Sequence, residues 1–175
     1  MSDLITTKQV REALALAKQL LVSDTRIGRI LGDPGTGKTA ISKLLPSLMS
    51  NCVRVCVWDG ITQKSLLQQL ANALTVQNEI GTTDALMKRC INNCADKLIL
   101  VDEANHLGRH HFEKLRHLAD EGGAAILLVG TDLQTLPFKD GRTKIYLAQM
   151  QRRIGTKQMF TQVMSKVDEI SAYVL

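Results

Sequence analysis

The sequence predicts an α/β fold in which helices cover both faces of a parallel sheet. Three observations support this prediction. Short apolar segments alternate with helical ones, and two of these apolar segments contain almost no polar residue. In addition, a glycine-rich loop follows the first apolar segment, at 27–31, and leads into a helix. Apolar runs of this kind are typical of strands buried on both faces of a parallel sheet. With 175 residues, 45% of them apolar, the chain fits a single folded domain.

The first elements follow from hydrophobic periodicity and turn residues. Thr6 and Gln9 have capping-box spacing, which predicts the start of a helix. The apolar residues that follow recur on one helical face: Val10, Leu14, Ala17 and Leu21. Residues 27–31 predict a short strand that runs into the glycine-rich turn, and residues 39–49 predict the next helix.

The rest of the chain continues this alternation. Further strands are predicted at 53–57, 97–101, 124–129 and 158–163. Helices are predicted at 62–77, 82–95, 109–121 and 143–154, with a short one that Asp132 caps and that ends before Pro137. Strands that alternate with helices imply parallel pairing with right-handed crossovers.

Composition limits the classes of function. No apolar run approaches the roughly 18 residues of a membrane helix, and residues 1–8 lack the layout of a signal peptide, so we expect a cytoplasmic protein without a membrane partner. The net charge of +5 permits a polyanionic partner. Since aromatic residues make up only 3% of the chain, nucleic acid would be bound through its phosphates rather than by base stacking.

The four cysteines come in two pairs with a spacing of four. Cys52 and Cys56 lie on one face of a predicted strand, and Cys90 and Cys94 share one face of a predicted helix. A metal site or a disulfide is the alternative, but this placement favours small buried side chains at all four positions.

Four histidines cluster near residue 110. They are His106, His110, His111 and His117. Because no cysteine and no metalloprotease motif accompanies them, a solvated helix face is favoured over a metal site.

The glycine-rich loop has the full pattern of a phosphate-binding loop. Its eight residues are Gly32, Asp33, Pro34, Gly35, Thr36, Gly37, Lys38 and Thr39, and they stand between a predicted strand and a predicted helix. The glycines let the backbone curl so that amide groups and the helix N-terminus point at the phosphates of ATP. Lys38 is then expected to reach the β- and γ-phosphates, while the Thr39 hydroxyl holds Mg²⁺.

Two adjacent carboxylates end the third predicted strand. We expect Asp102 to be a carboxylate that binds Mg²⁺, and Glu103 to be the base that orients the attacking water. An acidic pair after a strand can also be an ordinary cap, but the phosphate loop about 60 residues earlier favours the catalytic interpretation.

Two further positions are candidates for catalysis. Thr131 follows the fourth predicted strand, so it should face the same crevice as the phosphate loop, although it can instead cap a helix beside Asp132. Arg152 and Arg153 precede the last predicted strand and can supply a cation to a nucleotide on a neighbouring subunit; the alternative is a solvated basic turn.

Residues 26–163 resemble the AAA+ ATPases of the transposition-protein group, which includes the B protein of transposable phages such as Mu and the TniB-like proteins. The resemblance rests on four segments: 32–39, 98–107 (LILVDEANHL), 126–133 (ILLVGTDL) and 151–154 (QRRI). It implies a five-stranded sheet of order 5-1-4-3-2, ATP bound between adjacent subunits, Thr131 as the sensor and Arg153 as the arginine finger. It also implies a slow ATPase, stimulated by DNA or a partner, that assembles on double-stranded DNA as a ring or helical filament and assists a transposase.

The chain departs from the larger relatives at both ends. Residues 1–25 leave room for a leading helix but not for a helix-turn-helix domain, and residues 164–175 are expected to be a stub of the helical lid. Other functions remain open from the ATPase motifs, namely a secretion-type motor or regulator without a DNA role, a helicase loader, or a nucleotide switch. Glu103 argues against the switch. Possible phosphate contacts to DNA are Lys64, Arg109, Lys114, Arg116, Lys139, Arg142 and Lys144, although such side chains are usually only solvated.

Overall fold

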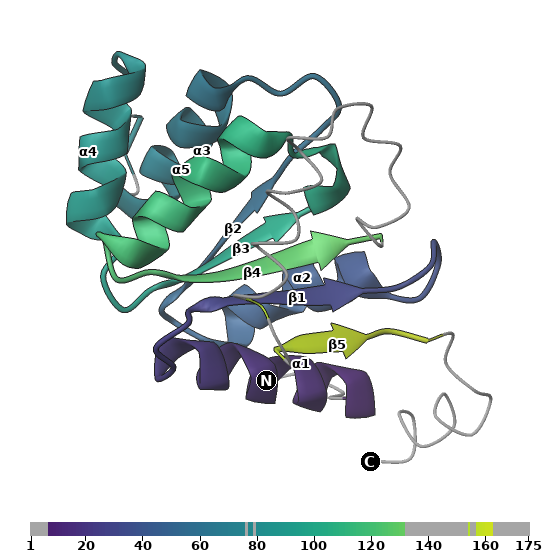
Figure 1. Ribbon diagram of the computed structural model, residues 1–175. Coiled ribbons are helices and arrows are strands. Elements are labelled where there is room, and N and C mark those ends of the chain that lie inside the picture. The colour runs from purple at the N-terminus through teal and green to yellow at the C-terminus, as the bar shows by residue number, and fades with distance from the viewer. Residues whose placement is uncertain (1–6, 76, 79, 132–153, 155–156, 163–175) are drawn as a thin grey trace.

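The computed structural model describes residues 7–75, 77–78, 80–131, 154 and 157–162. Within them one sheet of five parallel strands is flanked by helices on both faces, as Figure 1 shows. The strands are β1 (Ile27–Leu31), β2 (Cys52–Cys56), β3 (Leu98–Asp102), β4 (Ala125–Gly130) and β5 (Gln158–Phe160). Their order is β2-β3-β4-β1-β5, which confirms the predicted 5-1-4-3-2 arrangement.

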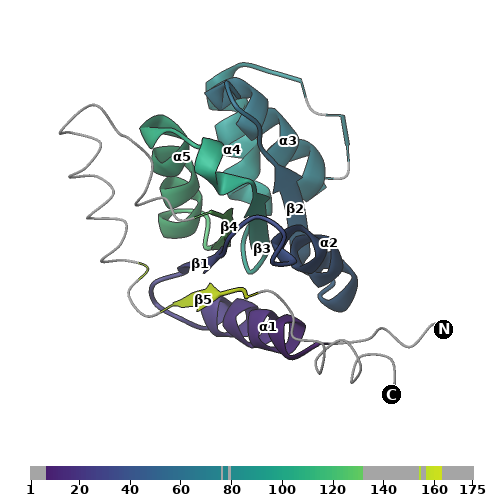
Figure 2. The ribbon, with the colours of Figure 1, turned by 90° about the vertical axis from the view of Figure 1, so that its right-hand side faces the viewer.

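Two helices of the described part cover one face of the sheet. They are α1 (Lys8–Leu21) and α2 (Lys38–Leu48), and their buried side chains share a core with Ile30, Leu100 and Leu127 of the strands. Figure 2 shows α1 lying beneath β5 and β1. The start of α1 differs by one residue from the predicted capping box, because the Thr7 hydroxyl caps the helix by accepting a hydrogen bond from the amide of Val10.

On the opposite face, the described residues form three helices. They are α3 (Gln63–Thr75), α4 (Thr83–Asn93) and α5 (Arg109–Asp120), and they enclose a second core with Ile99, Val101 and Ile126. A short 3₁₀ helix, η1 (Ala104–His106), connects β3 to α5 and was not predicted. None of the helices among the described residues is both long and apolar enough to cross a membrane.

Burial follows position in the sheet. Every residue of β1, β3 and β4 is buried, as expected for inner strands, whereas in the edge strand β2 only Cys52 and Val55 are buried. The predicted strand at 158–163 is shorter in the structure, ending at Phe160. The predicted short helix between its cap Asp132 and Pro137, the predicted helix at 143–154 and the lid stub at 164–175 fall on segments outside the described residues, Ile154 excepted, and stay predictions.

Two expectations about single side chains were wrong. Cys52, Cys90 and Cys94 are buried, but Cys56 is exposed because it ends an edge strand. His111 is half-buried rather than solvated, since it turns back over the start of α5 and its Nδ1 accepts a hydrogen bond from the amide of Gly108 at 3.0 Å. Within the described ranges no group of three or more His, Cys, Asp or Glu side chains is placed to hold a metal ion.

Candidate nucleotide site

The phosphate loop leaves the carboxyl end of β1 and leads directly into α2. Gly35 and Gly37 have φ angles of 81° and 86°, a left-handed conformation that side chains other than glycine rarely adopt. A Cβ added at either position would meet no atom within 4 Å. The two glycines therefore face open space beside the N-terminus of α2, where free amide groups favour an anion.

Lys38 is folded onto its own loop. Its ammonium group donates hydrogen bonds to the carbonyl oxygens of Gly32, at 2.7 Å, and Asp33, at 2.6 Å. The positive charge thus stands at the rim of the loop, as phosphate binding requires.

Parallel pairing brings the acidic pair to the same edge of the sheet. β4 separates β3 from β1, and all three strands end at this edge. Asp102, the last residue of β3, is 1% exposed. Glu103 follows with φ 58° and ψ 37°, a left-handed conformation that costs on the order of 1 kcal/mol for a residue other than glycine. Such strain concentrates at functional sites, and here it turns the backbone sharply after the strand.

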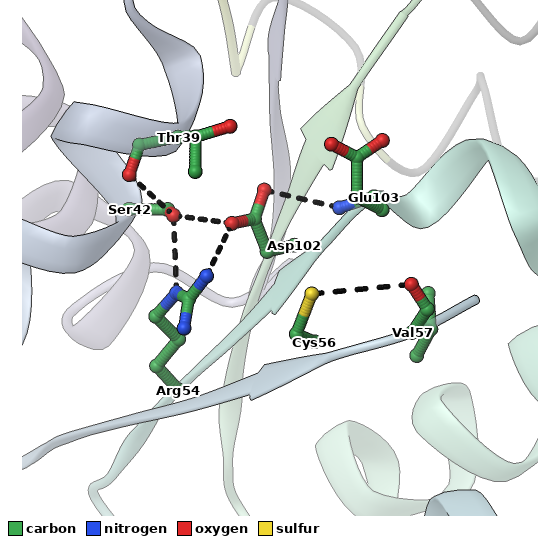
Figure 3. A network of polar contacts seen from close by, with 7 residues as sticks. All are labelled: Thr39, Ser42, Arg54, Cys56, Val57, Asp102 and Glu103. Atoms are coloured by element: carbon green, nitrogen blue, oxygen red, sulfur yellow. Dashed lines mark hydrogen bonds and ion pairs between the residues drawn. The ribbon is translucent and has the colours of Figure 1, made fainter.

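Three neighbours hold the Asp102 carboxylate. Ser42 and Arg54 both donate to Oδ2, at 2.5 and 2.6 Å, while the amide of Glu103 donates to Oδ1 at 3.0 Å. Arg54 also donates to the Ser42 hydroxyl oxygen at 3.1 Å, and that hydroxyl lies 3.0 Å from the carbonyl oxygen of Thr39 (Figure 3). The ion pair with Arg54 and the two further donors compensate the buried charge.

Glu103 is free of such contacts within the described residues. Its carboxylate has no hydrogen bond or ion pair there, and Figure 3 shows it directed away from Arg54, on the side toward which the Thr39 hydroxyl points. Lone pairs on Asp102 Oδ1 and Glu103, with the Thr39 hydroxyl, make an all-oxygen donor set, which is what Mg²⁺ and its bound water require. The chain's residues therefore fit a magnesium nucleotide.

Thr131 lies where the sequence predicts it, directly after β4. Since Gly130 pairs with Leu31, Thr131 stands beside the start of the phosphate loop. Its role as a sensor remains a prediction. Arg153, the expected arginine finger, and Arg152 lie outside the described residues.

Sequence reasoning missed four residues around the site: Ser42, Arg54, Asn105 and Thr161. Arg54 interrupts an otherwise apolar strand, and Ser42 lies one helical turn after Thr39, so both carried a signal. Asn105 packs against Gly130, because a Cβ added to that glycine would stand 2.8 Å from Asn105 Oδ1. The same Oδ1 is buried and has no hydrogen-bond partner among the described residues. Thr161 carried no sequence signal and contacts the loop across 125 residues.

A parallel sheet of this order, with a phosphate loop after β1 and an acidic pair after β3, defines a P-loop nucleotide-binding protein of the AAA+ type. Comparison with known families agrees: the AAA domain family matches residues 21–137, well over half of the chain. The chain belongs to this family.

One sequence relative narrows the assignment. The Mu-like prophage FluMu DNA transposition protein B of Haemophilus influenzae is 27% identical over 122 residues, which cover 66% of this chain and 41% of that protein. The chain thus spans less than half the length of this relative. Together with the family match, this similarity confirms the resemblance to AAA+ ATPases of the transposition-protein group.

Solved structures support the fold at low sequence identity. A structure of C. elegans PCH-2 matches with a TM-score of 0.51 and 18% identity, over 93% of this chain and 44% of that one. The S. cerevisiae Hsp104-ADP complex matches with a TM-score of 0.52 and 14% identity, over 96% and 36%. Likeness at this level concerns the fold alone.

Proposed function

We propose that this chain binds and hydrolyses ATP with Mg²⁺ and assists DNA transposition as a DNA-associated assembly factor. The observation that carries the ATPase proposal is the placement of Glu103 at the same sheet edge as the phosphate loop, with its carboxylate unpaired among the described residues. The similarity to a transposition protein carries the second half and favours it over a secretion-type regulator or a helicase loader.

Each site residue has a defined task in this proposal. Lys38 exchanges the carbonyl oxygens of Gly32 and Asp33 for phosphate oxygens. Thr39 and Asp102 hold Mg²⁺, which neutralises the charge that develops on the phosphates. Glu103 orients a water molecule for attack on the γ-phosphorus and accepts its proton.

Residues outside this core complete the proposal. Thr131 contacts the γ-phosphate side of the site, and Arg153 stabilises the transition-state charge on the nucleotide of an adjacent subunit in a ring or filament. DNA or a transposase stimulates turnover. A cytoplasmic location follows from the DNA partner.

The structure bears on which cations can contact DNA. Arg109 and Arg116 of α5 lie near carboxylates of the same helix: Arg109 is 3.7 Å from Glu113, and Arg116 is 3.4 Å from Asp120. These acidic neighbours offset part of the positive charge of α5. This helix is therefore a weaker candidate for phosphate contacts than the sequence indicates.

Two variants test the chemistry. Lys38→Ala should abolish binding of a fluorescent ATP analogue, while Glu103→Gln should keep binding and stop phosphate release. Lys43→Ala and Glu121→Gln, at exposed positions, are matched controls and should behave as wild type. Normal turnover by Glu103→Gln would refute its assignment as the base.

Cosedimentation with duplex DNA tests the transposition role. Binding should require ATP and should weaken steeply as salt rises, because phosphate contacts release counterions. If no ATP-dependent DNA binding occurs at low salt, the DNA role is wrong even where ATP turnover is normal.

A further inference from the structure

Thr161 joins the end of β5 to the phosphate loop. It is 5% exposed, and its amide and its hydroxyl both approach the carbonyl oxygen of Leu31, at 2.7 and 3.1 Å. Leu31 is the last residue of β1, directly before the loop. The hydroxyl of Thr161 also lies 2.7 Å from the hydroxyl of Thr36, inside the loop.

Thr36 and Gly32 complete a tight cluster. Thr36 is 5% exposed, and its hydroxyl lies 2.8 Å from the carbonyl oxygen of Asp33, a carbonyl that also accepts from Lys38. A Cβ on Gly32 would overlap the Thr161 hydroxyl and would stand 2.7 Å from that of Thr36. The first half of the loop therefore packs directly against Thr161.

The two hydroxyl groups depend on each other because each has a single proton. If Thr161 donates to Thr36, Thr36 can donate to Asp33; if Thr36 donates to Thr161, Thr161 can donate to Leu31. In both arrangements the bond between the hydroxyls is kept. The first arrangement also leaves the Asp33 carbonyl with a donor when Lys38 turns to a phosphate.

β5 has anchors that do not involve the loop. Arg29 donates to the side-chain oxygen of Gln158 at 2.9 and 2.6 Å, and the Lys157 ammonium contacts Ser23 and Thr25. The strand is only three residues long and lies at the edge of the sheet beside α1 (Figure 2). These anchors should keep β5 in place when the Thr161 hydroxyl is removed.

We propose that Thr161 is a positioning residue of the phosphate loop, and that its hydroxyl couples nucleotide binding to the docking of β5 on β1. The inference rests on the proposed ATP binding. The Thr161 hydroxyl acts through Thr36, which it holds in place, and not through contact with the nucleotide. Coupling between two equilibria is reciprocal. If docking of β5 raises the affinity for nucleotide by a given factor, bound nucleotide must raise the equilibrium constant for docking of β5 by the same factor.

The first test compares dissociation constants for a fluorescent ATP analogue with Mg²⁺. Thr161→Val keeps the shape and removes the hydroxyl, so the dissociation constant should rise about five- to tenfold, the equivalent of one net hydrogen bond. Thr161→Ser should restore binding. Lys157→Ala, which loosens β5 at its far end, should stay within about twofold of wild type. Thr36→Val combined with Thr161→Val should be no weaker than the weaker single variant, because both changes break the same bond.

The second test measures amide hydrogen exchange at Phe160 and Thr161. In wild type the analogue should slow exchange by about the factor by which Thr161→Val weakens binding, and in Thr161→Val this effect should disappear. Urea unfolding without nucleotide should give only a slightly lower midpoint for Thr161→Val, because the hydroxyl bond is also present without nucleotide, and it should show that the variant is fully folded in the binding assay.

The outcomes are distinct. Unchanged affinity of Thr161→Val would overturn the inference while leaving ATP binding intact. So would equal losses in Thr161→Val and Lys157→Ala when slow exchange at Phe160 shows that β5 is still docked in Lys157→Ala. If the wild-type protein binds no nucleotide, the proposed function itself is wrong and the inference fails with it.

Discussion

Replacing Arg54 by methionine removes the guanidinium that pairs with the buried carboxylate of Asp102. Methionine keeps most of the aliphatic stem of the side chain, so the change tests the charge rather than the packing. The Asp102 side chain is 2% exposed and that of Arg54 is 24% exposed, with their nearest atoms 2.6 Å apart. The pair is thus buried on the carboxylate side and partly open to water on the guanidinium side.

The magnitude follows from what remains around Asp102. Removing one partner of a fully buried pair costs about 3–5 kcal/mol. Ser42 and the Glu103 amide still donate to the carboxylate, and water can enter where Arg54 was exposed, so we expect a loss of about 2–3 kcal/mol in the free energy of unfolding. For a domain of this size the unfolding midpoint should fall by about 5–10 °C.

Urea unfolding followed by circular dichroism, without nucleotide, measures this loss. Arg116→Met is the matched control, since its pairs with Glu113 and Asp120 lie on the surface and should contribute less than about 1 kcal/mol. In an Asp102→Asn background, Arg54→Met should cost about 1 kcal/mol or less, because no buried charge is left unpaired. An equal loss in both backgrounds would refute the reasoning, since it would mean that Arg54 stabilises the fold by packing alone.

Two other groups give predictions from their pKa shifts. Burial lowers the pKa of His111 below its ordinary value of 6.5, and the nearby His110 adds to this effect. The unfolded chain therefore binds the proton more readily than the folded one, so the free energy of unfolding should be fully retained above about pH 6.5 and should fall below that pH. In His111→Gln this fall should be smaller. Urea midpoints at pH 7.5 and 5.5 check this, and equal pH dependence in both proteins would contradict it. Burial raises the pKa of the Cys52 thiol to about 11, while burial and, after it, the charge of Asp102 raise the pKa of Cys56. Because Cys56 is the exposed cysteine, N-ethylmaleimide should modify it first in the native protein, and the reaction should become faster as pH rises. In urea all four cysteines should react. Mass spectrometry of the adducts measures the order of modification, and early modification of Cys90 or Cys94 would contradict the burial of these two side chains.

The sequence predicted the inner strands and the phosphate loop well for a local reason. β1, β3 and β4 are short apolar runs buried on both faces, so their composition alone identifies them, and the loop has its full pattern within eight residues. Parallel pairing then requires the acidic pair to reach the edge of the sheet where the loop begins.

The contacts that organise the site were not predictable in the same way. The ion pair of Arg54 with Asp102 joins residues 48 apart, and the hydroxyl pair of Thr36 with Thr161 joins residues 125 apart. Neither depends on spacing along one element, so only the register of β1 with β5 and of β2 with β3 brings them together. The errors at Cys56 and His111 have a similar cause, because their exposure depends on an edge strand and on a helix start rather than on residue type.

The place of β1 in the sheet has a consequence for how the protein is made. β1 leaves the ribosome before both of its neighbours in the sheet, β4 and β5, whose first residues are Ala125 and Gln158. The apolar strand β1 and the phosphate loop that follows it therefore remain without their neighbouring strands until about a hundred further residues have been synthesised. Pairings of such high sequence separation form slowly and leave the nascent chain prone to aggregation. Translation arrested before residue 125 should thus yield a chain that depends on chaperones, and nucleotide binding should begin only once β4 and β5 have left the ribosome.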